Sequence, residues 1–161
     1  MRAGGLAGAN QAAVCELLKA CAADMSKAGK KQKKGFCILI LVDDFADAGD
    51  KVMHSSTHAL TSLFVRGRHT GCACWLLSQK TRVISLICRT NFCWMLIWRM
   101  RNAKELSAII EELDALVPRA ELMEMYRMAT TDNHGFLYVN LLNERDQMFY
   151  KEFDQRFVLS E

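Results

Sequence analysis

The hydrophobic pattern along the chain alternates short apolar runs with amphipathic segments. The unbroken apolar run Phe36–Val42 predicts a strand that is buried on both faces. Further apolar runs predict strands at Cys72–Leu77, Phe92–Trp98 and Phe136–Leu142, with a last strand at Met148–Phe153. Helical spacing covers Ala12–Met25, His54–Arg66, Arg82–Cys88, Asn102–Leu113 and Pro118–Met128. Strands that alternate with helices favour βαβ units, so we expect an α/β fold with a largely parallel sheet flanked by helices.

Local signals sharpen three of these boundaries. Asn102 is a suitable N-cap for the helix whose apolar face carries Leu106 and Ile109. Pro118 fits the first turn of the next helix, and Gly67 is expected to end the helix that begins near His54.

Composition and charge restrict the class of protein. Of the 161 residues 51% are hydrophobic and one is proline, which is typical of a globular domain, and the net charge of +3 permits contact with nucleic acid without arguing for it. Seven cysteines without a secretory signal indicate reduced thiols in an intracellular compartment. The apolar runs are too short to cross a bilayer, so no membrane partner is expected.

The chain divides by composition into a lead-in and a single domain. Residues 1–35 are expected to form a helical lead-in and a lysine-rich loop, and residues 36–161 the domain itself. A solvated loop is the simpler interpretation of the lysines Lys27 to Lys34, ahead of a patch that contacts DNA phosphates.

Polar residues at two strand ends are the candidate chemistry. The first strand ends in Asp43-Asp44 and the second in Ser78-Gln79. In a parallel sheet the carboxyl ends of the strands share one edge, where ligands bind. Two carboxylates suit Mg²⁺, which keeps most of its waters, and a neutral amide suits the orientation of an attacking water. An acidic pair at a strand end is also common as a turn or a helix cap.

Two arginines lie between these strand ends. Arg66 and Arg68 flank Gly67 near the end of the predicted helix. An arginine there is suited to stabilising a transition state across a subunit interface. Basic residues at a helix C-terminus are equally expected from the helix dipole alone, so both interpretations stay open.

The ordered set of motifs resembles a known family. ILILVDDF, then LFVRGRHTGCACWLLSQK, then FCWMLIWRMRNAKEL resemble the DNA-packaging ATPases of poxviruses and other nucleocytoplasmic large DNA viruses, which belong to the FtsK–HerA class of P-loop motors. The resemblance runs from about Phe36 to Phe153. It implies a P-loop sheet, ATP as substrate, a homo-oligomeric ring, and double-stranded DNA and capsid or portal components as partners. It also implies a viral factory, cytoplasm or virion, or a host nucleus for an endogenous gene.

The resemblance assigns a role to each candidate residue. Asp43 matches the Walker B aspartate that positions Mg²⁺ through water, and Asp44 the second acidic residue, which acts as general base. Gln79 matches the sensor at the end of the next strand. Arg68 is the first choice for the arginine finger, with Arg66 as the alternative.

One motif of the family has no counterpart in the sequence. G-x-x-x-x-G-K-[ST], whose amides and lysine hold the phosphates, does not occur, and GGLAGAN at Gly4–Asn10 lacks both the lysine and the hydroxyl. In this class the strand before that loop lies in the middle of the sheet beside the sensor strand. We therefore expect the sheet to be incomplete on its N-terminal side and the chain to be the C-terminal portion of a longer protein.

Two other functions compete with a working motor. The first is a non-catalytic remnant, or an assembly or DNA-binding module, that keeps the fold without its phosphate loop. The second is a receiver-like Mg²⁺-binding signalling domain, because receivers also hold Mg²⁺ with an acidic pair after a strand. A receiver needs a phosphoacceptor aspartate after a later strand, whereas the later strands here end in Ser78-Gln79 and Trp98-Arg99.

Overall fold

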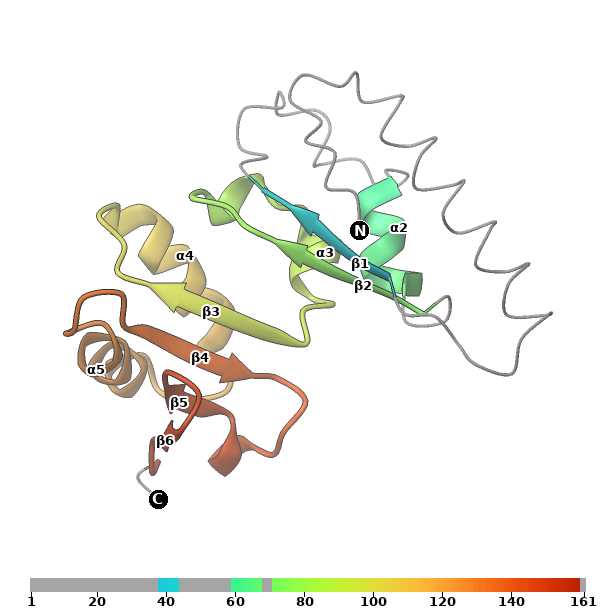
Figure 1. Ribbon diagram of the computed structural model, residues 1–161. Helices are drawn as coiled ribbons and strands as arrows, with labels where there is room; N and C mark the ends of the chain where they lie inside the picture. Colours follow the sequence, from blue (N-terminus) through green and yellow to red (C-terminus); the bar gives the residue numbers. More distant parts are fainter. Residues whose placement is uncertain (1–37, 44–58, 68–70, 160–161) are drawn as a thin grey trace. The chain divides into compact units, whose positions relative to one another are not determined.

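The computed structural model describes residues 38–43, 59–67 and 71–159 (Figure 1). These residues form two compact units, each described by itself below. Unit 1 holds the described residues up to Gln79 together with Val83–Arg89, and unit 2 holds Lys80–Arg82 and the chain from Thr90 onward. The predicted helix at Ala12–Met25, the lysine-rich loop and the proposed boundary at residues 35 and 36 lie outside the described residues.

Unit 1 is built on a pair of parallel strands. Strand β1 (Ile38–Val42) pairs with β2 (Cys72–Leu76) over five residues, from Ile38 opposite Cys72 to Val42 opposite Leu76. Helix α2 (Ala59–Arg66) connects towards β2 and packs against it, and the short helix α3 (Leu86–Arg89) packs against α2. The predicted strands and their parallel pairing are confirmed for this part of the chain.

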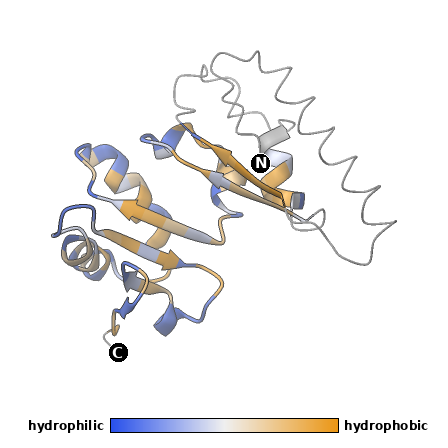
Figure 2. Cartoon of the chain, in the orientation of Figure 1, coloured by the Kyte–Doolittle hydropathy of each residue, from blue (hydrophilic) through white to orange (hydrophobic). Residues whose placement is uncertain are grey.

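The two faces of this strand pair differ in burial. Ile38, Ile40 and Val42 are half-buried, while Leu39 and Leu41 on the opposite face are 52% and 59% exposed. Both strands are apolar along their length (Figure 2). The prediction of a strand buried on both faces at Phe36–Val42 is therefore met on one face only by the residues that the structure describes.

Unit 2 is a four-stranded sheet with two helices. Its elements are β3 (Trp94–Trp98), α4 (Ala103–Leu113), α5 (Arg119–Ala129), β4 (Phe136–Asn140), η4 (Arg145–Gln147), β5 (Phe149–Lys151) and β6 (Gln155–Arg156). Unit 2 also holds the first two residues of η3 (Thr81–Val83), whose last residue belongs to unit 1. The sheet order is β3-β4-β5-β6, and every neighbouring pair is antiparallel.

The expectation of a largely parallel sheet is wrong for unit 2. The connection from β3 to β4 contains two helices, α4 and α5, and the chain returns along the neighbouring strand in the opposite direction. Short connections then join β4, β5 and β6, as antiparallel neighbours allow. The fold class of the described chain is mixed α/β, with one parallel and one antiparallel sheet.

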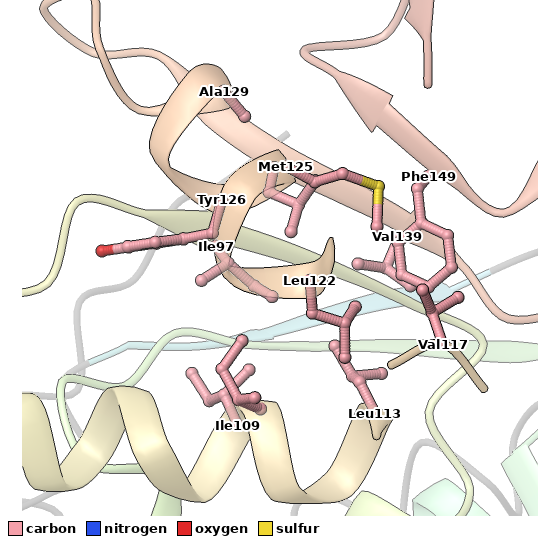
Figure 3. Packing of buried hydrophobic residues seen from close by; sticks show 12 residues of the cluster. Ile97, Ile109, Leu113, Val117, Leu122, Met125, Tyr126, Ala129, Val139 and Phe149 are labelled. Atoms are coloured by element: carbon pink, nitrogen blue, oxygen red, sulfur yellow. The ribbon is translucent and has the colours of Figure 1, made fainter. Parts of the chain in front are cut away.

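The core of unit 2 lies where α4 and α5 meet one face of the sheet (Figure 3). Its buried members are Ile97, Ile109, Ile110, Leu113, Val117, Leu122, Met125, Tyr126, Ala129, Leu137, Val139 and Phe149. Tyr126 is the amphipathic member of this set. Its hydroxyl oxygen accepts a hydrogen bond of 2.7 Å from the Met100 amide, so its polar end is satisfied in the core.

The helix boundaries follow from local chemistry. The Asn102 side chain accepts a hydrogen bond of 2.9 Å from the Lys104 amide, which confirms Asn102 as the N-cap of α4. Pro118 directly precedes α5, where its missing N–H costs no helical hydrogen bond. The predicted helix at Arg82–Cys88 is instead divided into η3 and α3. No helix among the described residues is long and apolar enough to cross a membrane.

Candidate functional site

The parallel pairing brings two of the predicted site residues to one edge of the sheet. Asp43 is the first residue after β1, and Gln79 is the third after the end of β2. The Leu77 amide donates a hydrogen bond of 2.8 Å to the Val42 carbonyl oxygen, so the ladder continues to the level of Asp43. Gln79 follows two residues after Leu77, so the backbone between these two residues spans at most roughly 7 Å. Both side chains are exposed at this edge.

The exposed edge fits a hydrated magnesium ion. Mg²⁺ is typically bound by one or two carboxylates and by substrate phosphates, and it keeps several waters. The Asp43 carboxylate is accessible for such a contact, and the Gln79 amide can donate and accept hydrogen bonds. No group of three metal-ligating side chains occurs within the described ranges, and a water-mediated Mg²⁺ site does not require one.

Two of the predicted site residues lie outside the described residues. They are Asp44, the proposed general base, and Arg68, the first choice for the arginine finger. Their roles stay predictions.

Arg66 lies near the start of β2, at the end of the strand pair opposite to Asp43 and Gln79. It is the last residue of α2, and the next residue, Gly67, packs against the start of β2. A Cβ atom at Gly67 would stand 2.8 Å from the Cys72 carbonyl oxygen, so this approach requires glycine. Asp43 and Gln79 follow the other end of the strands, about 13 Å along β2. Arg66 is therefore not brought together with them within unit 1.

Glu105 is a polar residue of interest that the sequence did not single out. It lies in the first turn of α4, and its side chain is buried. Its Oε2 atom accepts hydrogen bonds from the Thr81 amide at 2.7 Å and the Arg82 amide at 3.3 Å. No short motif marks it, because its partners are backbone amides 24 and 23 residues away in sequence.

The cysteines of β2 lie in an apolar setting. Cys72, Cys74, Cys88 and Cys93 are free thiols in the part of the chain that the structure describes. Burial, together with the neighbouring Cys88 and Cys72, raises the pKa of the Cys74 thiol to about 11. Cys88 also contacts the Thr61 hydroxyl, with 3.8 Å between Sγ and Oγ1. Cys72, Cys74 and Cys88 belong to the packing of unit 1, whereas Cys93 lies exposed in unit 2. The raised pKa of Cys74 makes this thiol a poor nucleophile.

We expect Cys74 to react far more slowly than Cys93 with iodoacetamide at pH 8. The raised pKa of Cys74 leaves it with a thiolate fraction roughly a hundredfold below that of an ordinary thiol, while Cys93 is exposed. Mass spectrometry of peptides after timed labelling measures both rates. Labelling in urea is the control, since unfolding should make the rates similar. Equal rates in the folded protein would contradict the burial of Cys74.

Comparison with known proteins identifies the family. The family described as Poxvirus A32 protein matches residues 13–155, which is most of the chain. No curated protein and no solved structure matches the chain at a significant level. The match spans β1, β2 and all of unit 2 up to the start of β6. The chain therefore belongs to the poxvirus A32 family of viral DNA-packaging ATPases.

Proposed function

We propose that this chain supplies the magnesium-holding and water-orienting residues of an ATPase that moves double-stranded DNA into a viral capsid. The observation that carries the proposal is the parallel register of β1 and β2, with Val42 opposite Leu76. Because of this register, the exposed carboxylate of Asp43 and the exposed amide of Gln79 follow neighbouring strand ends. Membership of the DNA-packaging family supports the packaging part of this proposal.

Each residue has a part in the proposed hydrolysis. Asp43 would hold Mg²⁺ through a bound water, and the chemistry that the ion would supply is neutralisation of the charge on the phosphates. Asp44 accepts a proton from the attacking water, and Gln79 orients that water towards the γ-phosphate. Arg68 of a neighbouring subunit stabilises the transition state, with Arg66 as the alternative. Arg66 lies near the start of β2, whereas Asp43 follows the end of β1. This separation favours a role for Arg66 in the site of a neighbouring subunit over a role in the site of its own subunit.

The phosphates of ATP need a binding loop that these 161 residues do not contain. No G-x-x-x-x-G-K-[ST] occurs in the sequence, so another segment or polypeptide is proposed to supply it. The strand before that loop would lie beside the sensor strand of a P-loop sheet. Among the described residues β2 is an end strand of its sheet, and β3 is an end strand of the other.

The test is Mg²⁺-dependent ATP hydrolysis by the protein encoded by the full transcript. We expect turnover that rises when double-stranded DNA is added and disappears when EDTA removes the metal. Sequencing that transcript upstream of the Met1 codon shows whether a strand and a phosphate loop precede the chain. Absence of DNA-stimulated turnover, with the loop present, would refute the proposal.

A second candidate is a non-catalytic member of the family. The missing phosphate-loop motif favours it for these 161 residues taken alone, which would bind DNA or a capsid component without hydrolysis. The receiver-like alternative is disfavoured by the family match. A viral factory, the cytoplasm or the virion is the proposed location, as suits a poxvirus family.

A further inference from the structure

Glu105 carries a carboxylate that is withdrawn from solvent. Only 9% of the residue is exposed, and no buried side-chain oxygen or nitrogen in the described part of the chain lacks a hydrogen-bond partner. Burying a carboxylate is costly unless hydrogen bonds replace its water. The contacts to the Thr81 amide at 2.7 Å and the Arg82 amide at 3.3 Å are therefore essential to this arrangement.

These two amides are the first of η3. The first amides of a helical turn have no partner within the turn and need an outside acceptor. A Ser, Thr, Asp or Asn just before the turn normally supplies it, whereas Gln79 and Lys80 precede η3. The acceptor comes instead from α4, far along the chain. A hydrogen bond from an amide to a carboxylate is roughly twice as strong as a hydrogen bond between two neutral groups. The two bonds to Glu105 therefore hold the backbone of η3 in place.

Gln79, the proposed water-orienting residue, lies two residues before Thr81 in the sequence. Only Lys80 separates them, so the backbone of Gln79 lies within about 7 Å of the anchored Thr81 amide. We propose that Glu105 is the positioning residue for Gln79: it fixes the backbone that follows Gln79 and thereby limits where the Gln79 side chain can point. This inference rests on the proposed function of Gln79 in the ATPase.

Glu105 acts through the backbone and takes no part in the chemistry itself. Its carboxylate is buried and committed to two amides, while the Gln79 side chain is exposed. A residue that only orients another should change the turnover number more than the apparent affinity for substrate. The loss should also be partly restored by a side chain that keeps one accepting oxygen.

The first test measures the backbone and Gln79 directly, by NMR of the full chain. In Glu105→Ala we expect the Thr81 and Arg82 amides to exchange with solvent about tenfold faster or more, and the Gln79 side-chain amide signal to shift. Glu105→Gln keeps a carbonyl oxygen, so intermediate exchange and a smaller shift are expected. Glu111→Gln is the matched control: it removes the same charge from the exposed face of α4 and should change none of these signals.

Should Glu105→Ala fail to fold, Glu105→Gln decides the question. Unchanged exchange at Thr81 and Arg82, or an unchanged Gln79 signal in the folded variant, would overturn the inference. The second test is ATP hydrolysis by the protein of the full transcript, where Glu105→Gln should lower kcat about threefold to tenfold with little change in KM. An inactive wild-type protein refutes the proposed function, whereas the NMR result judges the role of Glu105 separately.

Discussion

Replacing Phe149 by alanine is expected to lower the free energy of unfolding by about 3–5 kcal/mol. Phe149 is 1% exposed and is the largest fully buried side chain among the described residues. It lies on β5 opposite Val139, and its carbonyl oxygen accepts a hydrogen bond of 3.0 Å from the Phe157 amide. The surrounding side chains come from both helices and two strands, so they cannot close the cavity without moving several elements (Figure 3). Urea denaturation followed by circular dichroism measures the loss.

The matched control is Phe153→Ala in the turn that follows β5. Phe153 is 66% exposed, and its ring centroid lies 5.0 Å from that of Phe136 and 5.3 Å from that of Tyr138. Loss of these edge contacts is expected to cost about 1 kcal/mol. Equal losses for the two variants would mean that the packing of Phe149 beneath the helices does not contribute more to the stability of unit 2 than the exposed ring contacts do.

The helices of unit 2 could be predicted because their signals are local. Asn102 and Pro118 mark helix starts by chemistry that involves only the next few residues, and Ile109 and Leu113 are spaced for one buried face. These predictions are confirmed with boundaries within a residue or two.

The direction of the strands could not be predicted for a different reason. Phe92–Trp98 is apolar throughout, which predicted a strand but not which of its faces is buried. In the structure Ile97 points into the core while Trp98 is 48% exposed and packs against Phe136, with ring centroids 5.4 Å apart. Aromatic residues pack against each other on the outer face of this sheet. The alternation of apolar and polar residues that marks a one-sided antiparallel sheet is therefore missing from the sequence.

The candidate site was predictable only where it depends on strand ends. Asp43 and Gln79 follow consecutive parallel strands, so one topological rule places both at the same edge. Glu105 could not be found in this way, because it lies beside Leu106 on an amphipathic helix and an acidic residue there is usually solvated. Its burial depends on the position of η3, which only the folded chain defines.

Substitutions of Asp43 and Gln79 are expected to abolish most of the ATP hydrolysis by the protein of the full transcript, in two distinguishable ways. Gln79→Ala should lower kcat about 10²- to 10³-fold with little change in KM, since the orienting hydrogen bond acts in the transition state. Asp43→Asn should cause a comparable loss at low Mg²⁺, because one of the charges that holds the ion is removed. Raising the Mg²⁺ concentration should partly restore Asp43→Asn and leave Gln79→Ala unchanged.

The double variant tests whether the two residues belong to one site. Residues that act on the same transition state give losses that are far from additive, so the double variant should be little worse than Gln79→Ala alone. Asp154→Asn is the control, since this exposed carboxylate lies in the β5–β6 turn and should leave turnover unchanged. Fully additive losses, or rescue of Gln79→Ala by Mg²⁺, would separate Gln79 from the hydrolytic site. The shared edge of β1 and β2 would then be a structural consequence of the parallel register alone.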